Sequence, residues 1–135
     1  MLRIVIGLVL LAHGIGHSMG LLQLFRVAVV NPTWKGDSWL LTGVAGSTVS
    51  TVVGATIWIA AIIGFAALAG VVFGWLPAAW WQPLAIGSAV VSLAGLVLYP
   101  MAFPPLSSIG ALAVDVVLLV AVVWAGWMPS ELSAS

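Results

Sequence analysis

The sequence lacks cysteine and contains very few charged residues. Without cysteine the chain can form no disulfide, no thiolate metal site and no cysteine nucleophile. Only 4% of its residues are charged, three of them basic and three acidic, whereas a soluble domain carries about 25%. With so few basic side chains there is no positively charged surface for nucleic acid, so no nucleic-acid partner is expected. The composition also argues against a soluble fold.

Long apolar runs take the place of the missing charge, and 64% of the residues are hydrophobic. Stretches at about 3–25, 52–75, 82–103 and 106–127 each reach the roughly 20 residues that cross the hydrocarbon core of a bilayer. Most of the eight tryptophans fall near the ends of these stretches, as in an aromatic belt. We therefore expect an all-α integral membrane protein, a four-transmembrane-helix bundle that forms a single domain over residues 1–135 and lies in a lipid bilayer.

Two segments of this bundle allow more than one structural interpretation. Arg3 and the apolar run after it resemble the start of a signal peptide, but no small-x-small cleavage site follows, so we expect an uncleaved first helix. Residues 38–50 are fairly apolar but rich in glycine, serine and threonine. They suit either a short interfacial helix or the start of a long second helix. We favour a short interfacial segment between the first two spans, anchored by Trp34 and Trp39.

Two histidines stand in the first apolar stretch, at positions 13 and 17. Four residues along an α-helix rise about 6 Å and turn about 40° beyond a full circle, so His13 and His17 share a face. Asp115 lies near the midpoint of the last stretch, at a depth within ~5 Å of either histidine. A carboxylate there costs about 2.5–3.5 kcal/mol unless it is neutral or paired. We predict that the three side chains face the bundle interior and lie close together.

Other residues at or near this depth are candidates for the same site. Ser92 on the third stretch matches the depth of Asp115, and Tyr99 lies further toward the loop after the first helix. We include both as candidate ligand-binding residues, although the stripe that they form along one helix face is more typical of packing. Gly16 and Gly20 lie close to the histidine face, where glycine lets a helix or a flat ligand approach. Helix contact is the favoured interpretation of these glycines.

The His/His/Asp set is compatible with several kinds of chemistry. Two histidines and one carboxylate are the ligands of many non-haem iron sites and part of a zinc site, and a buried histidine beside glycine can ligate haem or a chlorin pigment. However, there is no HExxH motif, and a di-iron site needs more carboxylates than the single one in the core. Two histidines on one side of one helix cannot clamp a haem from opposite faces. Metal-free alternatives are proton handling, binding of an apolar ligand, or a hydrogen bond that fixes helix register.

Short motifs along the chain resemble a known group of proteins. The stretches are LLAHGIGHSMGLL, SWLL and IWIAAIIGFAALAG. They are similar to small, uncharacterised four-span bacterial membrane proteins with an N-terminal L-H-G-x-x-H helix. His13, Gly14 and His17 match the H-G-x-x-H element. A more distant similarity to DoxX-like proteins concerns size and topology only. The resemblance implies a four-helix bundle with the histidine helix first, and it implies no activity.

The sequence thus predicts a multi-pass protein of the bacterial inner membrane. Our leading interpretation is an accessory subunit of a larger membrane complex or a homo-oligomer, or else a bundle that binds a small apolar ligand, with no enzymatic role and no required cofactor. Its internal site is the cluster of His13, His17 and Asp115, with Ser92 and Tyr99 nearby. The alternative is a membrane redox protein that holds iron, zinc, haem or a chlorin pigment at His13, His17 and Asp115.

Overall fold

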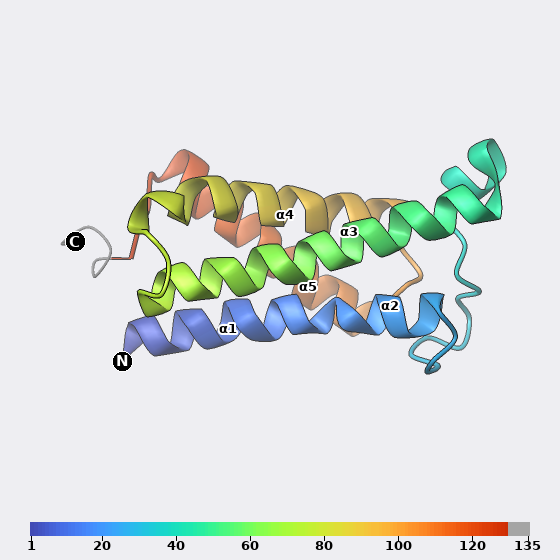
Figure 1. Cartoon of the computed structure of the whole chain (residues 1–135), viewed down its shortest axis with the longest axis horizontal. Helices are drawn as coiled ribbons and strands as arrows, with labels where there is room; N and C mark the ends of the chain where they lie inside the picture. The colour runs from blue at the N-terminus through green and yellow to red at the C-terminus, as the bar shows by residue number, and fades with distance from the viewer. Residues whose placement is uncertain (130–135) are drawn as a thin grey trace.

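The computed structural model of the chain describes residues 1–129, and these contain helices and no strand. The elements are α1 (Leu2–Gly16), α2 (Ser18–Leu24), α3 (Leu41–Phe73), the 3-10 turn η1 (Ala78–Trp80), α4 (Trp81–Leu98), α5 (Pro105–Leu119) and the π-helical turn η2 (Val120–Trp124). The helices run side by side along the long axis of the molecule (Figure 1). Four segments are long and apolar enough to cross a membrane, namely Leu2–Leu24, Leu41–Phe73, Ala78–Leu98 and Pro105–Trp124. The expected four-helix bundle is confirmed.

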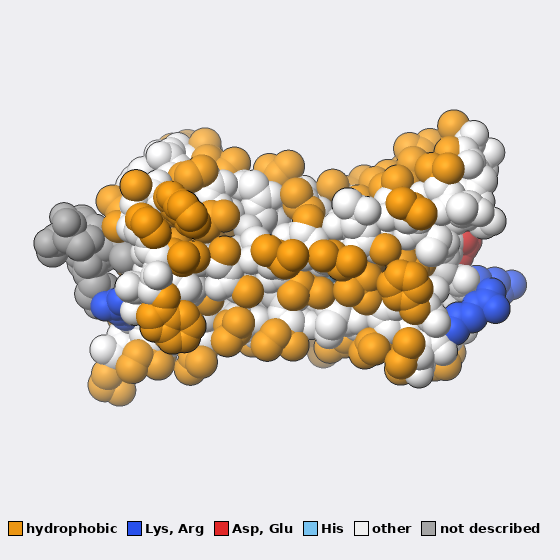
Figure 2. Space-filling view, viewed as in Figure 1, with side chains coloured by type: hydrophobic (Ala, Val, Ile, Leu, Met, Phe, Trp, Pro, Cys, Tyr) orange, Lys and Arg blue, Asp and Glu red, His pale blue; other side chains and the backbone are white. Residues whose placement is uncertain are grey.

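The longest helix, α3, forms the centre of the bundle. It packs against α1, α2 and α4, while α5 packs mainly against α4. Apolar side chains cover the middle of the bundle, and lysine and arginine gather at its two ends (Figure 2). This distribution suits helices surrounded by lipid, with the charged groups at the bilayer surfaces. The chain is a multi-pass membrane protein by the length and composition of its helices.

The structure differs from the prediction that residues 38–50 form a short interfacial segment. Helix α3 already begins at Leu41 and is interrupted only at Gly46, where φ is 88° and ψ is 165°. Residues 41–45 form a short turn set at an angle to the long part of α3, and the residues that follow belong to the long part itself (Figure 1). The buried Ser50 has a partner within the fold, since Thr42 Oγ1 donates to Ser50 Oγ at 3.0 Å. Ser50 therefore does not need to lie at the membrane surface.

The third span ends earlier than expected, at Leu98 instead of residue 103. Tyr99 has φ of −129° and ψ of 61°, outside the helical region. The cause is Pro100, because a proline ring disfavours helical geometry in the residue before it. The chain therefore leaves the helix at this point instead of bending within it.

A buried glutamine at the end of α2 organises the loop that follows. The Gln23 amide nitrogen donates to the carbonyls of Asn31 at 2.5 Å and Trp34 at 2.7 Å. Its oxygen accepts from the backbone N–H groups of Val30 at 2.9 Å and Asn31 at 2.6 Å. Asn31 Nδ2 in turn donates to the carbonyl of Met101 at 2.8 Å. One side chain thus holds the first loop in shape, and Asn31 ties that loop to the connection between α4 and α5.

Replacing this amide by a carboxylate is expected to open the loop. In Gln23→Glu two backbone carbonyls lose their donor, at about 0.5–1.5 kcal/mol for each bond. The carboxylate still accepts from Val30 and Asn31, but its oxygens now also face the two carbonyls and repel them. We therefore expect the whole loop over residues 27–34 to open more often and its amide hydrogen exchange to become about tenfold faster, measured by mass spectrometry on protein in nanodiscs. The control is Gln82→Glu, at an exposed position of α4. Unchanged exchange in the loop of Gln23→Glu would contradict this role.

Candidate functional site

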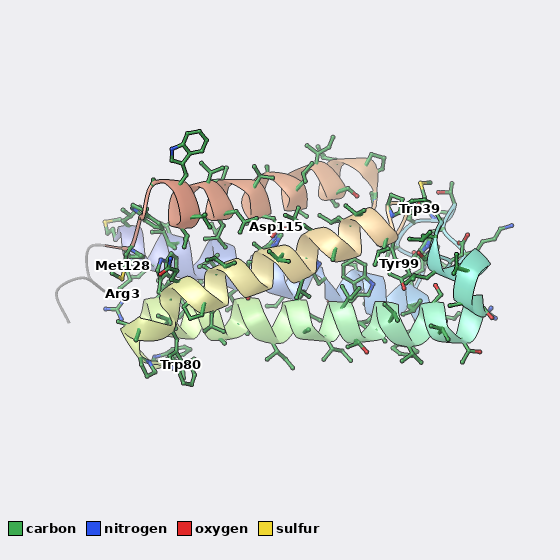
Figure 3. All side chains as sticks on the ribbon, turned by 90° about the horizontal axis from the view of Figure 1, so that it is seen from above. Arg3, Trp39, Trp80, Tyr99, Asp115 and Met128 are labelled. Atoms are coloured by element: carbon green, nitrogen blue, oxygen red, sulfur yellow. The ribbon has the colours of Figure 1, made fainter. Side chains whose placement is uncertain are left out.

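Four polar side chains from both ends of the chain meet inside the bundle. Asp115 of α5 is fully buried, and its Oδ1 lies 2.9 Å from His13 Nε2. Ser92 Oγ of α4 donates to Asp115 Oδ2 at 2.5 Å and lies 3.0 Å from His17 Nε2. Asp115 is midway along the bundle and points into it (Figure 3). The predicted convergence of His13, His17 and Asp115 is confirmed, and Ser92 is the link between the carboxyl and the second histidine.

Local backbone geometry places the two imidazoles side by side. His17 lies at the junction of α1 and α2, where its N–H bonds to the carbonyl of Gly14 and its carbonyl accepts from Gly20 N–H, both at 3.1 Å. These bonds span three residues instead of four, so the helix tightens there without changing course. The His13 and His17 rings remain on one face, with their centroids 4.9 Å apart and their planes at 77°.

Aromatic rings from other elements enclose the histidines. Phe65 stands edge-on to His13 with the centroids 4.4 Å apart, and Trp58 stacks on His17 at 5.5 Å with an interplanar angle of 13°. Phe103 meets His17 at 6.0 Å. Sequence reasoning missed all three. One available signal was Trp58, which lies well inside the second span instead of at its end, where interfacial tryptophans belong.

A groove between α1 and α5 opens beside the cluster. Its first part is a pocket of about 350 Å³ lined by both histidines and by small residues of the two helices, Ala12, Gly16, Gly110 and Ala111. A second hollow of about 360 Å³ continues it along α1 and α5, and the two share Val9 and Val114. We call the whole feature the α1–α5 groove. Its walls are almost entirely apolar, and the imidazoles of His13 and His17 are the ionisable groups that reach it.

The two glycines near the histidines have different surroundings. A Cβ atom at Gly20 would lie 2.9 Å from Trp58 Nε1, so this glycine permits a close helix contact, as expected. Gly16 lines the groove, and a Cβ atom there would meet nothing within 4 Å. The interpretation as a helix contact therefore fits Gly20 and does not fit Gly16.

Tyr99 lies outside the cluster. Its hydroxyl donates to the carbonyl of Ser50 at 2.5 Å, and its ring packs against Trp58 with the centroids 6.0 Å apart. Ser88, one helical turn before Ser92, is buried against Gly64 with no hydrogen-bond partner for its Oγ. Of the two predicted candidates on this stripe, Ser92 is thus a member of the cluster and Tyr99 is a packing residue, as is Ser88.

The chelating geometry that the iron and zinc hypotheses require is not formed. Within residues 1–129 no group of three histidine, aspartate or glutamate side chains is arranged to hold a metal ion. The Nε2 atoms of His13 and His17 point to different partners, Asp115 and Ser92 respectively. The two Nε2 atoms belong to a chain of hydrogen bonds and do not converge on one point. A metal would have to break that chain to bind.

The fold and the site together define a multi-pass membrane helical bundle with a buried histidine–aspartate–serine cluster at the floor of a lateral groove. No family model matches the chain, and comparisons with curated proteins and with solved structures find no match either. The functional argument therefore depends on the chemistry of the cluster and the shape of the groove.

Proposed function

We propose that the protein binds a small, largely apolar molecule within the membrane. The apolar part of the ligand lies along the α1–α5 groove, and its polar end contacts His13 and His17. The observation that carries this proposal is that an apolar groove opens onto two imidazoles. Ligand sites typically combine apolar walls with a few polar groups in this way. From Val5 to Met19 the lining of the groove follows α1 and the start of α2 for about 20 Å, enough for an extended chain.

The packing around the groove supports a ligand over a purely structural role. If the cluster served only to fix helix register, one histidine bonded to Asp115 would suffice, and α1 and α5 could close against each other. Instead, a Cβ atom at Gly16 or Gly110 would have no neighbour within 4 Å. By contrast, Cβ atoms at the buried Gly7 and Gly14 would clash with Phe73 and Phe65 of α3. Among the glycines of α1, Gly16 at the groove has free space and the two that face α3 have none.

The cellular setting is part of the same proposal. We place the protein in the bacterial inner membrane, in a homo-oligomer or a larger membrane complex. The first assignment is supported by the H-G-x-x-H resemblance at His13, Gly14 and His17. The second is supported by the many large apolar side chains on the outer surface, which can face either lipid or a neighbouring helix.

Filling the groove provides a direct test. Gly110→Leu puts a side chain into the pocket without a clash, because no atom lies within 4 Å of its Cβ position. The probe is a diazirine-bearing analogue of para-nonylphenol, cross-linked to the protein in nanodiscs and mapped by mass spectrometry. We expect labelling of peptides from α1 and α5, reduced at least tenfold in Gly110→Leu.

The matched control is Gly87→Leu, on the exposed face of α4. Its Cβ position is equally free of neighbours, but Gly87 does not line the groove. This variant should label as the natural protein does. Labelling spread evenly over all lipid-facing helices, and unchanged in Gly110→Leu, would overturn the proposed function.

A further inference from the structure

We infer that the groove selects a ligand whose polar head is an uncharged hydroxyl, such as a phenol, a quinol or a long-chain alcohol. This inference rests on the proposed function and names the chemical class of the ligand. It follows from the Nδ1 atoms of His13 and His17, whose rings both line the groove with their centroids 4.9 Å apart. One of them donates a hydrogen bond to the ligand and the other accepts one.

Counting hydrogens shows why the two Nδ1 atoms differ. A cluster with no net charge holds four exchangeable hydrogens, one each from Asp115, Ser92 and the two imidazoles. Three hydrogen bonds join these groups, one between His13 and Asp115, one between Asp115 and Ser92, and one between Ser92 and His17. Each bond uses one hydrogen, whichever way it points. A single hydrogen remains, and it must sit on one Nδ1 and leave the other as an acceptor.

The depth of the cluster favours this uncharged state. His13 lies midway along the Leu2–Leu24 span, and Asp115 is fully buried at the same level. Within residues 1–129 the contact between His13 and Asp115 is the one pairing of a basic with an acidic side chain closer than 4.0 Å. No arginine or lysine therefore balances a net negative charge here. Such a charge at mid-membrane costs at least about 2.5–3.5 kcal/mol.

The Nδ1 atoms of both buried histidines are unpaired within residues 1–129 but not fully enclosed. Neither has a hydrogen-bond partner among the described residues. The fully enclosed polar side-chain atoms without a partner are Trp58 Nε1 and Ser88 Oγ, and the imidazole nitrogens are not among them. The accessible space beside these rings is the groove, which both histidines line. A head group in the groove therefore meets one donor and one acceptor on rings 4.9 Å apart.

A hydroxyl satisfies this pair because it accepts one hydrogen bond and donates another. A carbonyl or an ether can accept a hydrogen bond from the Nδ1 that carries the hydrogen. It has no hydrogen to donate to the other Nδ1, which then stays unpaired in an apolar groove. A carboxylate or phosphate head would carry its charge to the centre of the bilayer, at a high cost. The chemistry of the site thus favours a hydroxyl over both alternatives.

Two probes that differ in a single hydrogen-bond donor test this inference on the natural protein. They are para-nonylphenol and its methyl ether, para-nonylanisole, used as unlabelled competitors of the photoreactive phenol in nanodiscs. We expect the phenol to compete at concentrations about tenfold lower than the ether, the difference that an unpaired Nδ1 produces. A third competitor, para-nonylbenzoate, carries a charged head and is expected to be the weakest.

The outcomes separate this inference from the proposed function. If phenol and ether compete equally well, and the labelling is still lost in Gly110→Leu, a ligand binds in the groove but the hydroxyl preference is overturned. Stronger competition by the benzoate than by the phenol overturns the uncharged head. If the photoreactive phenol gives no groove-specific labelling at all, the proposed function itself is overturned.

Discussion

Asp115→Ala is expected to lower the free energy of unfolding by about 2 kcal/mol, whereas Asp115→Asn costs less than about 1 kcal/mol. The alanine variant leaves His13 Nε2 and Ser92 Oγ buried without their shared partner. A buried polar group without a partner costs about 1–3 kcal/mol, and hydrogen bonds in membranes contribute at the low end, about 0.6 kcal/mol on average. Asparagine keeps one donor and one acceptor in the same place, as in a protonated carboxyl.

The measurement is equilibrium unfolding in mixed micelles, and a double-mutant cycle with His13→Ala isolates the pair. We expect a coupling energy of about 1–2 kcal/mol, near the upper end for membrane hydrogen bonds, because both side chains are buried. Val117→Ala, an exposed position on the same helix, is the control for loss of side-chain volume. Equal destabilisation by Asp115→Asn and Asp115→Ala would show that the hydrogen bonds contribute nothing.

The second large effect is expected at Gly95, where α4 passes the buried ring of Trp58. A Cβ atom there would overlap the six-membered ring of Trp58 and lie 2.8 Å from Cγ2 of Ile57. Because Trp58 has no exposed surface and also contacts Gly20 on its other side, it has little room to move. We expect Gly95→Ala to cost about 1–3 kcal/mol through overpacking.

Thermal unfolding followed by circular dichroism measures this cost, and Gly87→Ala provides the comparison. With no atom within 4 Å of its Cβ position, Gly87 should tolerate alanine or gain about 0.5–1 kcal/mol from it. Combining Gly95→Ala with Trp58→Phe should recover part of the loss, because the smaller ring relieves the overlap. If the losses of the two single variants simply add, the overlap is not the cause.

The cluster was predictable from sequence because helix geometry sets both the face and the depth of a side chain. Positions 13 and 17 share a face in any helix, and Asp115 at the midpoint of another span must meet them if all three point inward. The groove was not predictable in this way. It exists because α1 packs on α3 and leaves a space toward α5. The spacing of apolar residues along four apolar helices does not indicate which helices pack against each other.

The remaining differences have local causes that can be named. Tyr99 was grouped with Ser92 because both lie on one helical stripe, yet Pro100 ends the helix at Leu98 and redirects the tyrosine. That rule could have been applied from the sequence. The serines and threonines around Ser50 suggested a membrane surface, but Thr42 and Tyr99 bond to Ser50 inside the fold. Such partners come from distant or kinked segments and cannot be read from composition.

The direction in which the groove opens decides how a ligand arrives. The groove runs along two membrane-spanning helices and is not a hole at the end of the bundle, so its mouth faces the acyl chains. A ligand reaches it by lateral diffusion within the bilayer and displaces a lipid tail on entry. Occupancy is then governed by the mole fraction of ligand among the lipids, and its concentration in water matters only through partitioning. Diluting the protein with additional lipid at constant total ligand should therefore empty the site.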